Sequence, residues 1–180
     1  MVKRISKRIE SESELDKLIK DTRNLRQAIK SIYNPTKFLI INGTEVANYR
    51  NSGFPKFGDI SNIVTNAINQ GYRPLYVIIE ESMRYLIEEQ ELIEYEQALN
   101  SGLTHKQLNC KLIESNSIEE HIKQLLKLAY ENNAKIMTNE NIIETYKSLY
   151  LKPGGKFEKF EGKPWQIKYN YEQEQFKIIE

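Results

Sequence analysis

Polar residues follow directly after the first long apolar run of this chain. Residues 38–41 read Phe-Leu-Ile-Ile, and the next four residues, 42–45, read Asn-Gly-Thr-Glu. A short continuous apolar run is typical of a strand that is covered on both faces of a sheet. Open α/β sheets bind their ligands at the carboxyl ends of such strands. The sequence therefore predicts a polar loop at residues 42–45 that carries a functional site.

Lysine and aromatic residues are interleaved in a second stretch of chemical interest. These are Lys152, Lys156, Phe157, Lys159, Phe160, Lys163 and Trp165. Lysines attract phosphates and aromatic rings stack on bases, so such a stretch can grip single-stranded nucleic acid. The alternative is a solvated, lysine-rich loop with its aromatic side chains folded beneath it. The sequence leaves both interpretations open.

Other residues of chemical interest give weaker signals. His105 and His121 have no second ligand at zinc spacing, and no nucleophile motif surrounds Cys110. A single cysteine also excludes an internal disulfide. We therefore expect neither a zinc site nor a covalent mechanism.

Charge is unevenly distributed in a chain that is nearly neutral overall. Lys and Arg number 26, and Asp and Glu number 25, so the overall balance does not indicate a nucleic-acid partner. Basic residues predominate in residues 1–30, whereas residues 80–96 are rich in glutamate and contain Arg84 as their single basic residue. No apolar run reaches the length of about 20 residues that a membrane span needs. We therefore expect a soluble, cytoplasmic protein with no membrane partner.

Periodicity predicts an alternation of strands and helices. Apolar runs predict strands at 38–41, 75–79, 111–114 and 136–138. Helical spacing predicts helices at 12–33, from Asp59 to Gly71, from the second strand to Gly102, from Ser117, and at 141–150. Asp59 can cap the second of these helices. Such an alternation favours a parallel sheet with helices on both sides. The length of 180 residues fits one domain.

Several segments together resemble the NYN branch of the PIN-like ribonucleases, closest to the regnase-type domains. Residues 38–47 are similar to the family signature Ile-Asp-Gly-Ser-Asn-Val-Ala, and residues 71–80 with Arg84 are similar to the family's second strand and the arginine after it. Residues 128–140 resemble a helix and a strand that end in Ser-Asn-Asp, and residues 165–171 resemble the last strand. The resemblance covers residues 37 to 176. It implies a Rossmann-like, three-layer α/β/α sandwich with a mostly parallel sheet of about five strands. This PIN-like domain would span residues 35–180, after an N-terminal helical extension at 1–34.

The resemblance also implies a metal-dependent endoribonuclease that uses Mg²⁺ or Mn²⁺. Asn42 stands in place of the first metal-binding aspartate, and Glu45 stands three residues later in place of an asparagine. Glu140 and Glu144 match two further acidic positions. These four residues are the candidate metal ligands and, with Glu119, the candidate catalytic residues. An amide carries no charge, and each glutamate is one methylene longer than aspartate, so the expected metal affinity is reduced.

The same resemblance suggests RNA as a partner, and we expect this RNA to be single-stranded. Candidate RNA-binding residues under this resemblance are Arg84, Thr138 and Asn139, and the lysine-rich stretch adds Lys152, Lys156 and Lys159. An arginine among many glutamates is equally typical of an ion pair. We expect Asn42, Glu140 and Glu144 to lie together at the carboxyl ends of the first and fourth strands.

Several alternatives stay open at this point. Glu119 is either a ligand shifted by one helical turn or a residue that merely favours the positive start of its helix. His121 aligns with one of the paired aspartates, yet we expect an ordinary, exposed histidine. The alternative function is a catalytically degenerate PIN-like domain that serves as an RNA-binding or protein-interaction module. The sequence also leaves open whether the protein forms a homodimer.

Overall fold

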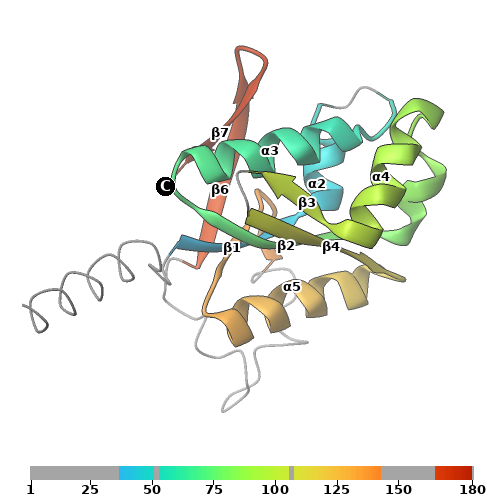
Figure 1. Ribbon diagram of the computed structural model, residues 1–180. Helices are drawn as coiled ribbons and strands as arrows, with labels where there is room; N and C mark the ends of the chain where they lie inside the picture. The colour runs from blue at the N-terminus through green and yellow to red at the C-terminus, as the bar shows by residue number, and fades with distance from the viewer. Residues whose placement is uncertain (1–36, 51–52, 106–107, 143–164, 180) are drawn as a thin grey trace, which may run out of the picture. The chain divides into compact units, whose positions relative to one another are not determined.

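The computed structural model describes residues 37–50, 53–105, 108–142 and 165–179 (Figure 1). The predicted helix at 12–33, most of the predicted helix at 141–150 and the lysine-rich stretch at 152–163 lie outside these residues.

A seven-stranded sheet organises the described residues. Its strands are β1 (Phe38–Asn42), β2 (Arg73–Glu80), β3 (Leu103–His105), β4 (Leu108–Ser115), β5 (Lys135–Met137), β6 (Gln166–Glu172) and β7 (Gln175–Ile179). They follow the order β3-β4-β2-β1-β5-β6-β7. The neighbours from β4 through β6 are parallel, whereas β3 and β7 pair antiparallel with β4 and β6. The predicted α/β class is confirmed, with a mixed and curled sheet that has antiparallel edges.

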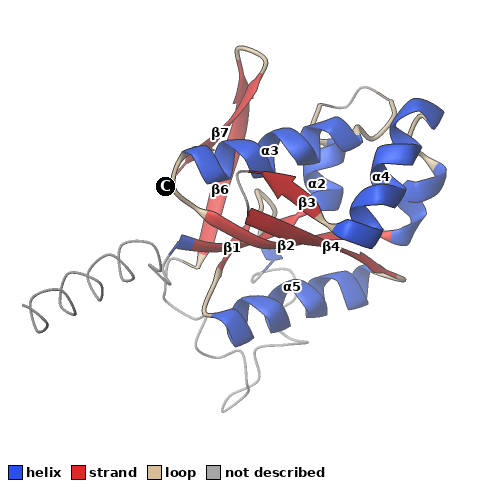
Figure 2. Cartoon of the chain, viewed as in Figure 1, coloured by secondary structure: helices blue, strands red, loops and turns tan. Residues whose placement is uncertain are grey.

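Helices lie on both sides of this sheet (Figure 2). They are α2 (Gly43–Asn48), α3 (Phe57–Asn69), the 3-10 helix η2 (Glu81–Tyr85), α4 (Glu89–Ser101) and α5 (Ile118–Asn132). Helices α2, α3 and α4 lie on one side and α5 on the other (Figure 1). Alternate residues of β1 and β2 face the two sides. Leu39 and Ile41 pack into the core under α2 and α3, and Ile40 packs into the core under α5.

Three local expectations were wrong. The polar segment after β1 is a helix, α2, and not a loop. Asp59 does not cap α3, because α3 begins at Phe57 and the buried Asp59 carboxylate pairs with Arg50. The predicted single acidic helix after β2 is divided into η2 and α4, which are separated by residues 86–88.

Other helix ends follow the prediction. The hydroxyl of Ser117 accepts a hydrogen bond from the backbone N–H of Glu120 and caps α5. Helix α4 ends before Gly102, whose φ of 79° lies in the left-handed region that favours glycine. Helix α5 is thereby fixed at its amino end beside the carboxyl ends of β2 and β4.

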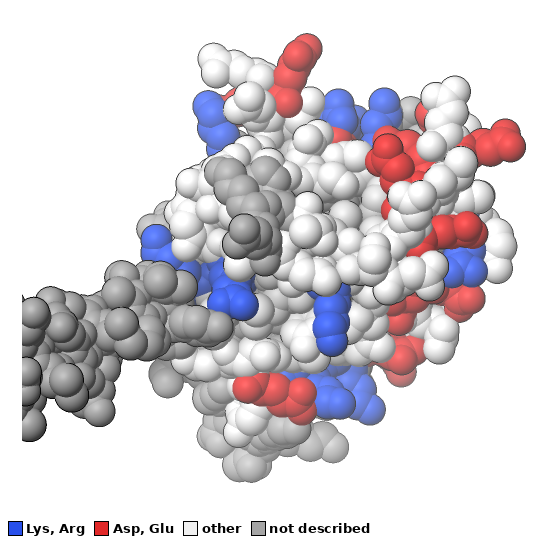
Figure 3. Space-filling view, viewed as in Figure 1, with Lys and Arg blue, Asp and Glu red and all other residues white. Residues whose placement is uncertain are grey.

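Acidic side chains gather on one side of the molecule, over η2 and α4 (Figure 3). Basic side chains lie mostly over the other elements visible in this view. In the part of the chain that the structure describes, no helix is long and apolar enough to cross a membrane.

Candidate functional site

Asn42 lies at the centre of a polar cluster at the carboxyl end of β1. Its side chain is 2% exposed. The amide oxygen Oδ1 accepts a hydrogen bond from the backbone N–H of Glu45 (3.3 Å) and lies 2.9 Å from Nε2 of His121. The amide nitrogen Nδ2 faces Oε2 of Glu45 (3.3 Å), Oγ1 of Thr138 (3.4 Å) and Oε2 of Glu140 (3.4 Å). The predicted proximity of Asn42 and Glu140 is therefore confirmed, whereas Glu144 lies outside the described residues.

Gly43 allows α2 to begin immediately after Asn42. A Cβ atom at this position would lie 2.5 Å from Val77 Cγ1 and 2.5 Å from Ile79 Cγ2. The absence of a side chain lets the first turn of α2 pack directly on β2. This close packing places Glu45 over the ends of the neighbouring strands.

Glu45 is held by protein donors on both carboxylate oxygens. Oε1 accepts from the backbone N–H of Asn139 (2.8 Å) and from the hydroxyl of Tyr169 (2.9 Å). Oε2 accepts from the hydroxyl of Thr138 and from the Asn42 amide. Burial, together with the Glu45 carboxylate, raises the pKa of Tyr169, so that its hydroxyl stays protonated and donates. Glu45 is thus a half-buried, fully hydrogen-bonded carboxylate.

His121 is buried and contacts the site, contrary to the expected exposed histidine. Its side chain is 1% exposed on the inner face of α5. Nδ1 lies 3.1 Å from the hydroxyl of Ser115, which in turn lies 3.0 Å from the carbonyl oxygen of Ile79. An acceptor at Asn42 Oδ1 requires the neutral tautomer with its hydrogen on Nε2, and Nδ1 is then an acceptor; the single hydroxyl hydrogen of Ser115 can go either to this nitrogen or to the carbonyl oxygen of Ile79, not to both. Burial lowers the pKa of His121 to about 4, which keeps the ring uncharged at neutral pH.

Glu140 reaches the cluster from the solvent side. It follows β5, and its backbone N–H donates to Oγ1 of Thr138 (3.2 Å). Burial of the carboxyl group raises its pKa, as do the carboxylates of Glu45 and Glu80, whereas the hydrogen bond from Asn42 lowers it. The folded chain therefore disfavours the charged form of Glu140.

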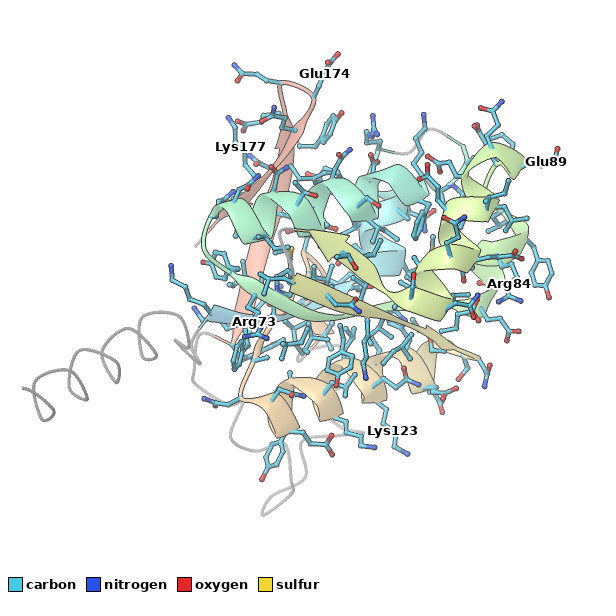
Figure 4. The ribbon with its side chains drawn as sticks, in the orientation of Figure 1. Arg73, Arg84, Glu89, Lys123, Glu174 and Lys177 are labelled. Atoms are coloured by element: carbon cyan, nitrogen blue, oxygen red, sulfur yellow. The ribbon has the colours of Figure 1, made fainter. Side chains whose placement is uncertain are left out.

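Arg84 and Glu119 have surroundings other than this cluster. Nη2 of Arg84 forms an ion pair with Oε2 of Glu114 (3.1 Å), so the ion-pair interpretation is confirmed. Arg84 lies beyond the carboxyl end of β2, whereas Arg73 marks the amino end of this strand (Figure 4). Glu119 is exposed in the first turn of α5.

Thr138 and Asn139 belong to the framework of the cluster. Thr138 is fully buried. The side chain of Asn139 donates to the carbonyl of Tyr169 (2.9 Å) and accepts from its backbone N–H (3.0 Å), which joins the end of β5 to β6. These contacts give both residues a structural role in the cluster. The predicted RNA-binding residues Lys152, Lys156 and Lys159 lie outside the described residues.

The described donor set does not fit a divalent cation. Mg²⁺ and Mn²⁺ need several free, preferably charged oxygen ligands. Here the N–H₂ group of Asn42 points at the carboxylates, and the oxygens of Glu45 already accept from four protein groups. Within the described ranges, no group of three or more His, Cys, Asp or Glu side chains is arranged to hold a metal ion.

Sequence reasoning missed His121, Ser115 and Tyr169. One signal was available for His121, because it precedes Ile122 and lies four residues before Leu125 on the apolar face of α5. Ser115 and Tyr169 gave no comparable signal, since their roles depend on contacts between distant segments.

Comparison with known proteins adds no further assignment. No protein-family model matches the chain, and no curated protein matches it either.

Proposed function

We propose that this chain is a catalytically degenerate, PIN-like domain that binds single-stranded RNA in the cytoplasm without cleaving it. The proposal includes the finer fold assignment, a Rossmann-like three-layer sandwich of the PIN type. Helices on both sides of the central parallel strands support this assignment. Fold alone does not establish function, so the argument depends on the cluster around Asn42.

One observation carries the proposal: Asn42 and His121 form a buried, uncharged pair joined by a 2.9 Å hydrogen bond. Under the resemblance described above, both positions would be aspartates. Replacement of two anionic ligands by a neutral pair removes the charge that holds a hard divalent cation. Without this cation the domain lacks the means to activate water and to neutralise charge on the phosphate.

The RNA-binding part of the proposal is supported by residue type. Lys152, Lys156 and Lys159 alternate with aromatic residues that can stack on bases. The described surface over η2 and α4 is acidic and would repel phosphates (Figure 3). We therefore assign RNA binding to the lysine-rich stretch and not to the η2 and α4 surface.

Fluorescence anisotropy with an end-labelled, single-stranded RNA tests this proposal. Binding should weaken steeply as salt rises, because bound phosphates release counterions. Lys156→Glu combined with Lys159→Glu should weaken binding strongly. Lys177→Glu is the matched control, because Lys177 lies on β7 in an ion pair with Glu172. The full chain should leave the same RNA intact with Mn²⁺ present. Equal affinities for all three proteins would refute the assignment of RNA binding.

A metal-dependent endoribonuclease that uses Mg²⁺ or Mn²⁺ is the second candidate function. Glu140 favours it, since this carboxylate lies at a strand end beside Glu45 and Glu80 and has a raised pKa. Additional ligands would have to come from residues such as Glu144. Cleavage of RNA by the wild-type chain that is abolished by Glu140→Gln would establish this function over the first.

A further inference from the structure

The Asn42 amide lies where two carboxylates approach each other. Its Nδ2 atom lies 3.3 Å from Oε2 of Glu45 and 3.4 Å from Oε2 of Glu140. An N–H₂ group carries partial positive charge on two hydrogens, and it can donate to two oxygens at once. It therefore reduces the repulsion between Glu45 and Glu140 as a bound cation would, although more weakly.

The orientation of the amide is set from its other side. Asn42 Oδ1 faces the backbone N–H of Glu45 and Nε2 of His121. The hydroxyl of Ser115 contacts Nδ1, the other nitrogen of the His121 ring. A flipped amide would turn its N–H₂ group toward these donors and its oxygen toward two carboxylates. His121 and Ser115 are thus positioning residues for the amide.

An aspartate at position 42 would place a third carboxylate beside those of Glu45 and Glu140. Its second oxygen would take the place of Nδ2, among Oε2 of Glu45, Oε2 of Glu140 and the hydroxyl of Thr138. Neighbouring oxygens that bind one Mg²⁺ or Mn²⁺ at about 2.1 Å lie about 3 Å from each other. This spacing is close to the distances observed between Asn42 Nδ2 and these oxygens. Loss of the amide would also free Oε2 of Glu45 from one of its donors.

We propose that the Asn42 amide, positioned by His121 and Ser115, is a built-in replacement for a divalent cation between Glu45 and Glu140. The wild-type cluster then needs no cation, and the single substitution Asn42→Asp makes it depend on one. This inference concerns cation dependence only. It does not require that the chain binds RNA, and its test contains no RNA.

Thermal unfolding in EDTA and in increasing Mn²⁺ tests the inference. The Tm of the wild-type chain should be the same in both conditions. The Asn42→Asp variant should have a lower Tm in EDTA, and its Tm should rise with the logarithm of the Mn²⁺ concentration, as expected for a ligand of the native state. Asn62→Asp is the matched control, because it adds the same charge at an exposed position of α3. Loss of the free Mn²⁺ signal in electron paramagnetic resonance measures binding directly.

A double variant keeps the test decisive if Asn42→Asp alone does not fold in EDTA. Adding Glu140→Gln removes one of the three negative charges, so the double variant should fold without cation and respond weakly to Mn²⁺. Three results would overturn the inference. These are a Mn²⁺-dependent Tm of the wild type that Glu140→Gln removes, a folded Asn42→Asp variant that does not bind Mn²⁺, and failure of the double variant to fold.

Discussion

Protonation of His121 should destabilise the fold as the pH falls. The ring is buried between β4 and the end of β1, where it contacts the uncharged groups of Ser115 and Asn42. The folded state lowers the pKa of His121 from 6.5 to about 4. The unfolded chain therefore binds a proton at pH values where the folded chain does not. Stability from this residue is complete above the unfolded pKa and is lost as the pH falls toward the folded value.

The magnitude follows from this shift in pKa. Each pH unit between the two pKa values changes the free energy of unfolding by up to about 1.4 kcal/mol. Close to pH 5 the loss should be about 2 kcal/mol, and near pH 4 it should approach about 3 kcal/mol. A loss of this size is a large fraction of the stability of a typical domain, which is about 5 to 15 kcal/mol.

Urea unfolding of the wild-type chain and of His121→Gln isolates this contribution. The glutamine side chain can still donate to Asn42 but does not titrate between these pH values. Carboxylates such as Glu140 titrate in both proteins, so their contribution cancels in the difference. Between neutral pH and about pH 5, the wild type should lose about 2 kcal/mol more than the variant. Parallel losses in the two proteins would refute the neutral, buried state of His121.

Three further predictions concern residues that position the cluster or the core. Gly43→Ala should lower the free energy of unfolding by about 1 to 3 kcal/mol in urea titrations, because its Cβ would overlap Val77 and Ile79; an unchanged midpoint would contradict the close packing of α2 on β2. Arg50→Ala should lower the free energy of unfolding by about 3 kcal/mol or more in the same assay, since it leaves the fully buried Asp59 carboxylate without its ion-pair partner. A loss no larger than that of an exposed ion pair would contradict the structural role of this pair. Cys110 should react with iodoacetamide at pH 8 only after unfolding, because burial raises its pKa to about 12; rapid labelling of the native chain, followed by mass spectrometry, would contradict this burial.

Strands of the central sheet could be predicted from sequence because their residues are apolar on both faces. Residues 38–41 and 75–79 fall within β1 and β2, which are buried between the two helical layers. The edge strands could not be predicted in this way. In β7, buried Phe176 alternates with exposed residues, and β3 has three residues only. Such short segments become strands through pairing with β6 and β4.

The position of the site was predictable, but its chemistry was not. Asn42 and Glu140 follow apolar strands, and strand order alone brings their ends together. The state of Glu45 depends on donors from the segment after β5 and from β6, which lie about a hundred residues later in the chain. Residue type gave no indication that these donors would occupy its oxygens. For the same reason, the sequence predicts a helix cap at Asp59, whereas the structure pairs this carboxylate with Arg50.

The network around Asn42 joins the ends of several strands through uncharged groups. Asn42 closes β1, Ser115 closes β4, Thr138 follows β5, and His121 comes from α5 on the opposite side of the sheet. Buried polar groups are costly unless they are hydrogen-bonded, and each of these side chains has a partner in the network. The four elements are thus joined by hydrogen bonds at the edge where parallel strands end. Because this network is uncharged at its centre, its integrity should not depend on a metal.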